Sequence, residues 1–204
     1  MPYKKYHKKI KKLLSLNLSK TDKVAGKFVI SITDYCGNLL YSLNALDAFD
    51  REINRFNQFS FINMRMIIDC CTEVQALLLV KDKNSYYNKF FKGSPTNQIK
   101  ISGQALTKSY LLSELEKEFA EINEIYKECC NWIHPSKSIV PSDLYGGYIK
   151  EYTGYRGRIY TNEEDENEDI YRDIDYCVDV LFTLLSRIYQ YYLQVDTVTK
   201  SDDI

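Results

Sequence analysis

Apolar residues recur at intervals of three and four along most of this chain, which is the spacing of one face of an α-helix. A strand would instead alternate at every second position. The longest stripe lies near the C-terminus and comprises Ile174, Cys177, Val178, Leu181, Leu184, Leu185, Ile188 and Tyr192. A second stripe comprises Leu115, Phe119, Ile122, Tyr126, Cys129 and Ile133. Each stripe predicts one amphipathic helix.

Two further helices are predicted nearer the N-terminus, at roughly residues 34–57 and 60–80. The first carries the apolar positions Leu39, Leu43, Leu46, Ile53 and Phe56. The second carries Met64, Ile67, Ile68, Cys71, Val74 and Leu78. Ser60 stands at the start of the second helix, where a serine hydroxyl can accept a hydrogen bond from a free backbone N–H.

Glycine and proline mark the predicted loops. Neither residue occurs from Asn38 to Lys92 or from Gln104 to His134, and four of the eight glycines lie between Gly146 and Gly157. We therefore expect long helices with loops near 93–103 and 135–165. The segment "GGYIKEYTGYRGRIY" suits a loop or short hairpin.

Together these patterns predict an all-α protein, an antiparallel four-helix bundle with helices of about 20–30 residues. The Gly/Tyr-rich loop or short hairpin would precede the last helix. Residues 1–27 are expected to form an extra basic helix that packs on the bundle, which would span residues 28–204 with an insertion near 140–170. The chain has 204 residues, 45% of them hydrophobic, enough for a substantial core.

Charge is nearly balanced overall but unevenly placed. The net charge is -1, so the protein as a whole has no electrostatic field that would attract nucleic acid or a membrane surface. The first 27 residues nevertheless carry nine lysines, whereas "EEDENED" at Glu163–Asp169 is an acidic run that suits a solvated linker or a partner for those lysines. No apolar stretch approaches the roughly 18 residues that span a bilayer, and no signal-peptide pattern follows the N-terminus. We expect a cytoplasmic protein with no membrane segment.

The six cysteines suggest no metal site. They include the adjacent pairs Cys70–Cys71 and Cys129–Cys130, and no C-x-x-C spacing occurs. Neighbouring residues on a helix point about 100° apart, so neither pair forms a simple ligand pair. We expect small buried apolar side chains, no metal and no cofactor.

Residues suited to chemistry lie on the two middle helices. His134 ends the third helix in "NWIHPSKS", one turn after Asn131, and a histidine there can move protons or simply cap carbonyl groups. Arg65 and Asp69 share one side of the second helix. They can form a structural ion pair, or the guanidinium can bind an oxyanion.

Two stretches resemble a known family. "MRMIIDCCTEVQALLLVKD" (Met64–Asp82) resembles the second helix of the bacterial DUF5677 family, and "YKECCNWIHPS" (Tyr126–Ser136) resembles the end of its third helix. That family is similar to the HEPN superfamily of four-helix bundles, which includes toxins, abortive-infection proteins and RNA-cleaving effectors. The resemblance covers roughly residues 34–192. It implies that Arg65, Asp69, Asn131 and His134 approach one another between the second and third helices.

One departure bears on catalysis. HEPN ribonucleases typically carry an arginine four to six residues before the histidine, where this chain has Cys129, Glu128 and Lys127. The usual motif is therefore absent. A composite site remains a hypothesis, in which His134 transfers protons and Arg65 stabilises the phosphorane without a metal.

The flanking charges allow RNA contacts. Candidate RNA-binding residues are Lys4, Lys5, Lys8, Lys9, Arg156 and Arg158, although the lysines can equally form a solvated face and the loop arginines can contact a partner. Tyr189, Tyr191 and Tyr192 suit a homodimer face or an ordinary core.

Three functional interpretations follow. The first is an HEPN-like effector acting on RNA, in a toxin pair with an antitoxin-like partner or in antiphage defence. The second is a non-catalytic helical module that binds a protein partner or a phosphorylated ligand. The third gives Arg65, Asp69 and His134 only structural roles.

Overall fold

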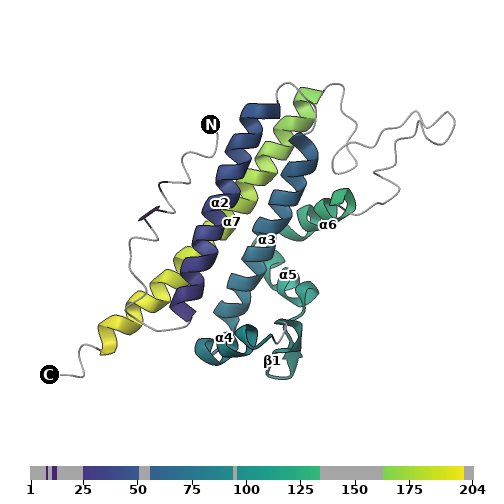
Figure 1. Ribbon diagram of the computed structural model, residues 1–204. Coiled ribbons are helices and arrows are strands. Elements are labelled where there is room, and N and C mark those ends of the chain that lie inside the picture. Colours follow the sequence, from purple (N-terminus) through teal and green to yellow (C-terminus); the bar gives the residue numbers. More distant parts are fainter. Residues whose placement is uncertain are drawn as a thin grey trace.

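The computed structural model describes residues 8, 11–12, 25–50, 56–93, 96–133 and 163–199, and these are mostly α-helical. Three long helices dominate this part of the chain: α2 (Ala25–Asp50), α3 (Phe56–Leu79) and α7 (Glu163–Thr199). Helix α2 runs in the opposite direction to α3 and α7 (Figure 1). The mostly helical fold predicted from the sequence is thereby confirmed.

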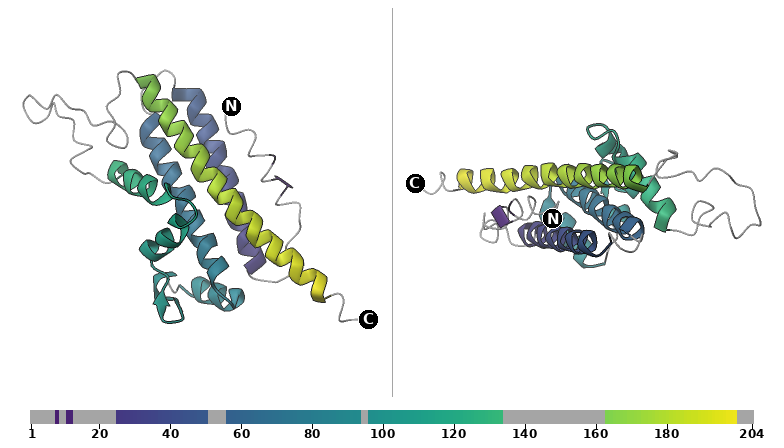
Figure 2. Two further views of the ribbon diagram at one scale, coloured as in Figure 1. Left: turned by 180° about the vertical axis from the view of Figure 1, so that it is seen from behind. Right: turned by 90° about the horizontal axis from the view of Figure 1, so that it is seen from above.

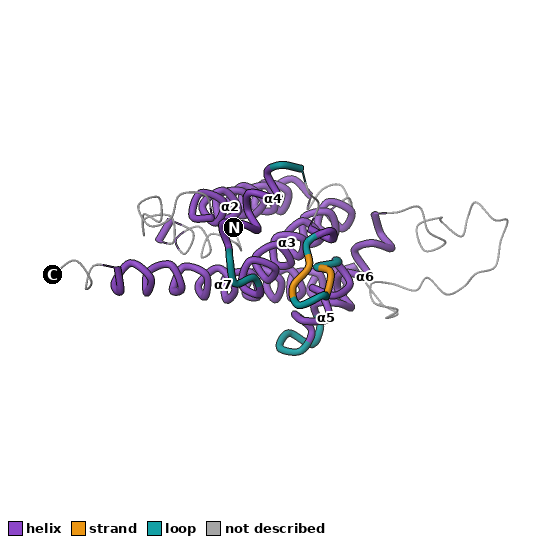
Figure 3. The backbone as a smooth tube through the Cα atoms, turned by 90° about the horizontal axis from the view of Figure 1, so that it is seen from below, coloured by secondary structure: helices purple, strands orange, loops and turns teal. Residues whose placement is uncertain are grey.

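The shorter elements lie on the side of α3 away from α2, or near its C-terminal end (Figures 1 and 2). These are α4 (Lys83–Phe91), the 3₁₀ turn η2 (Thr96–Gln98), β1 (Lys100–Ile101), β2 (Gln104–Ala105), α5 (Lys108–Glu116) and α6 (Ile122–Ile133). Strands β1 and β2 form the antiparallel hairpin drawn in orange in Figure 3. Its tip places Ser102 at φ 49° and Gly103 at φ 85°, the left-handed conformations that a two-residue hairpin turn requires.

Helix α3 is the centre of the core and contacts α2, α5, α6 and α7. Its sequence is apolar around most of its circumference, as expected for an enclosed helix. The fully buried residues Met64, Ile67 and Ile68 each contribute about 1.5–3 kcal/mol by leaving water. One strip of α3 that stays partly open to solvent contains Ile62, Arg65, Met66, Asp69 and Glu73.

Helix α7 confirms its predicted apolar stripe. From Ile174 to Ile188 each residue of that stripe is buried. Tyr189 is also buried, and its hydroxyl lies 3.3 Å from the Thr33 hydroxyl of α2. Because Thr33 donates to the backbone oxygen of Val29, Tyr189 is the donor to Thr33. Tyr189 therefore belongs to the core and not to an exposed dimer face.

The single helix expected across Leu115–Ile133 is wrong, because a turn at residues 117–121 separates α5 from α6. Helix α7 contacts this turn twice. Arg187 holds the Glu118 carboxylate, with 2.8 Å between Nη1 and Oε2, and the Tyr176 hydroxyl accepts a hydrogen bond of 3.3 Å from the Glu121 backbone N–H. Long-range contacts of this kind leave no mark in the local spacing of apolar residues.

Three local predictions also need correction. Helix α2 begins at Ala25 and continues through Gly37, so it starts before residue 34 and ends before residue 57. Ser60 lies inside α3 and is buried, so it is not a cap. The acidic run forms the first turns of α7 instead of a linker, since negative charge there is favourable to the helix dipole.

Some predictions concern segments that the structure leaves undescribed. Lys8, Lys11 and Lys12 are helical and exposed, whereas the packing of the segment 1–27 on the bundle stays a prediction. The Gly/Tyr-rich segment lies outside the described residues. None of the described helices has the length and apolar character needed to cross a membrane.

Candidate functional site

The open strip of α3 carries Arg65, which meets Tyr126 of α6. The guanidinium carbon of Arg65 lies 5.5 Å from the centroid of the Tyr126 ring, and the Arg65 side chain is 26% exposed. A cation over an aromatic face at this distance is attracted by about 0.5–1 kcal/mol where solvent has access. Tyr126 thus holds the guanidinium at the α3–α6 seam while leaving part of it open to solvent.

Asp69 lies between two cations, and the nearer one was not predicted. Its Oδ1 is 2.8 Å from Nζ of Lys108, whereas its Oδ2 is 3.9 Å from Nε of Arg65. Lys108 also donates a hydrogen bond of 2.6 Å to the Thr72 hydroxyl, one turn further along α3. Arg65, Asp69, Thr72, Lys108 and Tyr126 together are called the Arg65–Lys108 cluster below.

The sequence could not have identified Lys108 as a member of this cluster. Lys108 is the first residue of α5, directly after Thr107, whose hydroxyl accepts a hydrogen bond of 3.2 Å from the Tyr110 N–H. That capping pattern predicts the start of a helix. It does not predict that α5 packs against α3 in the register that brings Lys108 to Asp69.

The ionisable side chains of the cluster influence one another. Partial burial disfavours the charge on Arg65, but the neighbouring Tyr126, Cys130 and Asp69 outweigh it and raise the pKa of Arg65. Burial, with Asp69 and Cys130, raises the pKa of Tyr126, although Arg65 opposes this shift. Arg65 therefore stays positive and Tyr126 stays a neutral phenol near neutral pH.

A second tyrosine flanks the strip from α2. Tyr35 is 41% exposed, and burial of part of its ring together with Cys70, Cys36 and Asp69 raises its pKa. Tyr35 and Tyr126 come from the two helices that border α3 on opposite sides (Figure 1). The open strip and the start of α5 therefore bring together two cations, Arg65 and Lys108, with a tyrosine from each neighbouring helix.

Of the four site residues predicted from the sequence, the structure brings Arg65 and Asp69 together. Asn131 is exposed on α6. It follows Tyr126 by five positions, so it points about 140° around the helix from the Arg65 contact. His134 lies outside the described residues, one position after the end of α6 at Ile133.

The predicted RNA-binding residues are mostly outside the described chain as well. Lys8 is helical and exposed. The structure leaves Lys4, Lys5, Lys9, Arg156 and Arg158 undescribed, so their contribution to a site stays a prediction.

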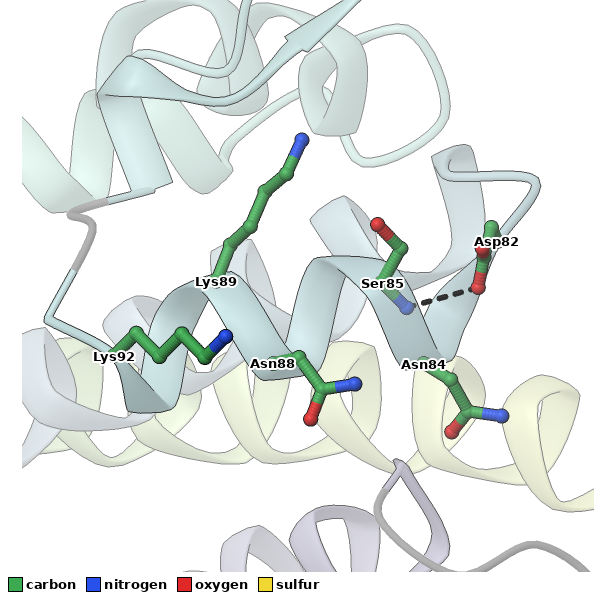
Figure 4. A pocket seen from close by; sticks show the side chains of 6 residues that line it. All are labelled: Asp82, Asn84, Ser85, Asn88, Lys89 and Lys92. Carbon is green, nitrogen blue, oxygen red and sulfur yellow. Dashed lines mark hydrogen bonds between the residues drawn. The ribbon is translucent and has the colours of Figure 1, made fainter.

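A hollow on the outer face of α4 offers no comparable arrangement. It has a volume of about 400 Å³ and is lined by Asp82, Asn84, Ser85, Asn88, Lys89 and Lys92 (Figure 4). Asp82 accepts a hydrogen bond of 2.8 Å from the Ser85 N–H at the start of the helix, and Lys89 points away from Asn88 and Lys92. These are ordinary side chains of an exposed helix and do not converge on one point.

Glu73 forms a third polar group on α3, with a structural role. The Tyr86 hydroxyl donates to it at 3.1 Å and the Thr96 hydroxyl at 3.2 Å, which ties α4 and η2 to α3. Burial and the Glu73 charge raise the pKa of Tyr86. Both hydroxyl groups donate to the same carboxylate oxygen, Oε2, so Glu73 anchors α4 and η2 to α3.

The cysteines are placed as small core residues. Five are buried, Cys130 is half-buried, and burial is the main cause that raises the pKa of the Cys71 and Cys129 thiols. Among the described residues, no group of three or more histidine, cysteine or acidic side chains is arranged to hold a metal ion.

Comparison with known proteins gives no match to a family model, to a curated protein or to a solved structure.

Proposed function

We propose that this protein binds RNA over the Arg65–Lys108 cluster and acts on it as an HEPN-like effector. The observation that supports this is the convergence of Arg65 of the open strip and Lys108 of α5 on Asp69, with Tyr126 against Arg65 and the partly exposed Tyr35 on α2. Cations that hold phosphates beside aromatic rings that stack on bases are the usual means of binding single-stranded nucleic acid. The near-neutral net charge confines such binding to a local surface.

The proposed architecture is a four-helix bundle whose third position is filled by α5 and α6 together. Contacts between neighbouring helices support a bundle in which consecutive helices run in opposite directions. Ser42 of α2 donates to Asn63 of α3, and Trp132 at the end of α6 stacks on Phe61 near the start of α3. The N-terminal half of α2 likewise meets the C-terminal half of α7.

In this proposal His134 supplies the proton transfers of a metal-independent endoribonuclease. An imidazole can remove the proton of a 2′-hydroxyl and return one to the leaving 5′-oxygen, and a guanidinium can stabilise the phosphorane between these steps. Tyr126 supports the assignment, because it contacts Arg65 from the same helix that leads directly to His134. Such an enzyme suits a cytoplasmic toxin or antiphage protein, held in check by an antitoxin-like partner or acting as a homodimer.

One observation favours a second candidate, a non-catalytic module that binds a phosphorylated ligand. Arg65 lies beside Asp69 and Tyr126, and Asn131 is exposed on α6, about 140° around that helix from Tyr126. A cluster arranged in this way can hold a phosphate without assembling catalytic groups around it.

The test is binding and cleavage of a fluorescent single-stranded RNA by the purified full chain. We expect Arg65→Ala and Lys108→Ala each to weaken binding by about tenfold, the usual effect of losing one charge-assisted contact. Lys117→Ala is the matched control, because Lys117 is exposed and paired with Glu114. His134→Ala should bind RNA but not cleave it.

Each alternative result has a distinct meaning. Absence of RNA binding by the unaltered chain would refute the proposal. Binding without cleavage, equal in the unaltered chain and in His134→Ala, would select the non-catalytic module.

A further inference from the structure

The carboxylate of Asp69 occupies the place between two cations that an anionic ligand would take. One oxygen contacts the Lys108 ammonium at 2.8 Å, and the other lies 3.9 Å from Nε of Arg65. The Asp69 side chain is 39% exposed, so it can turn towards water when another anion arrives. A phosphate presents two oxygens in a similar way and can bridge the same pair.

Each cation also has a neutral partner that does not depend on Asp69. The Thr72 hydroxyl accepts from Lys108 at 2.6 Å, and it donates at 2.8 Å to the backbone oxygen of Asp69. Arg65 lies over the Tyr126 ring. Both cations therefore stay positioned if the carboxylate leaves, as a preorganised binding site requires.

Charge decides which ligand displaces the carboxylate. An internal phosphodiester of RNA carries one negative charge, as Asp69 does, so the exchange brings no additional attraction. A terminal phosphate carries about −1.5 to −2 at pH 7 and has three acceptor oxygens. It can also meet the planar fork of an arginine with two hydrogen bonds.

We propose that the Arg65–Lys108 cluster binds terminal phosphate groups in preference to internal phosphodiesters, and that Asp69 is the group they displace. This inference rests on the proposed function, because it describes which part of an RNA the cluster binds. Asp69 acts as an internal competitor: a diester has to expel an equal charge, whereas a phosphate monoester gains on exchange. The cluster then binds the phosphorylated end of an RNA strand.

The experiment compares one short 3′-labelled oligoribonucleotide with a 5′-phosphate and with a 5′-hydroxyl, using the full chain. We expect the 5′-phosphorylated strand to bind about tenfold more tightly, as for one additional charge-assisted contact. Asp69→Asn keeps the side-chain size and removes the competing charge, so both strands should gain affinity, while the 5′-phosphorylated strand should still bind more tightly. Asp179→Asn is the charge-matched control, on the exposed side of α7.

The outcomes separate this inference from the proposed function. Equal affinity for both strands, with binding still weakened by Arg65→Ala, overturns the selectivity and leaves RNA binding intact. If neither strand binds, RNA is not the ligand, and adenosine 5′-monophosphate is compared with adenosine by calorimetry. Binding of the monophosphate alone, lost in Lys108→Ala, then supports the terminal-phosphate site on a small ligand, and no binding overturns it.

Discussion

The ring of Trp132 lies parallel to the ring of Phe61, with 4.8 Å between their centroids and 11° between their planes. Trp132 belongs to the last turn of α6 and Phe61 to the second turn of α3, so this stack positions the end of α6 over α3. The Trp132 indole N–H also donates to Glu128 at 3.1 Å, which fixes the ring on its own helix.

Phe61→Ala should therefore both destabilise the protein and release the end of α6. Phe61 is fully buried, and removing such a ring costs about 3–5 kcal/mol of the free energy of unfolding. Trp132 is the only tryptophan, so its fluorescence in a denaturant titration reports the same site. Ile62→Ala is the control. Ile62 is 40% exposed, so this substitution should lower the free energy of unfolding by at most about 1 kcal/mol. Similar losses in both variants would contradict the assigned stack.

Lys83 gives the protein a pH-dependent stability at alkaline pH. Lys83 is 9% exposed, and its ammonium group donates a hydrogen bond of 3.0 Å to the Val80 backbone oxygen. The Lys83 Nζ atom also lies 4.1 Å from the centroid of the Tyr191 ring. Burial lowers its pKa below the ordinary value of 10.5. Between the folded-state pKa and 10.5 the unfolded chain binds more protons, so the free energy of unfolding contributed by Lys83 rises with pH.

Lys83→Met tests this dependence because it keeps the aliphatic packing and removes the charge. The difference in unfolding free energy, unaltered protein minus variant, should increase as the pH rises through that window and level off above it. Lys89→Met on the exposed side of the same helix is the control. An equal pH dependence in both variants would show that burial of Lys83 is not its cause.

Cys130 should be the reactive thiol of the folded protein. It is half-buried beside Tyr126 and Arg65, whereas the other five cysteines are buried. Buried thiols are inert because the thiolate is the reactive form and burial disfavours it. A disulfide reagent should therefore label one thiol quickly and the rest only after unfolding.

Cys130→Ser should abolish the fast phase, and Cys70→Ser should leave it unchanged. Persistence of the fast phase in Cys130→Ser would show that another thiol is the reactive one.

The sequence predicted the fold best where a helix buries one continuous stripe. The positions from Ile174 to Ile188 are spaced for a helix, and the same residues form the buried side of α7. It failed at residues 117–121, where neither glycine nor proline interrupts the pattern. The break depends on contacts with α7, which local spacing does not encode.

The candidate site was predicted in part for a similar reason. Arg65 and Asp69 share a helix side at a spacing of four, so their proximity follows from helix geometry. Lys108 reaches the same carboxylate from another helix, and its closer contact depends on how α5 packs. The prediction that His134 joins Arg65 stays untested, since His134 lies beyond the described end of α6.

The turn between α5 and α6 also bears on how the chain assembles during synthesis. Two contacts join this turn to α7. Glu118 and Arg187 are separated by 69 positions in the sequence, and Glu121 and Tyr176 by 55 positions. Pairings over such long separations form late, because a long loop must close first. A chain still emerging from the ribosome lacks Arg187 until the residues before it have been translated. The turn that leads into α6, and so to Tyr126, is thus secured only after α7 has been synthesised, which delays any activity at this surface until then.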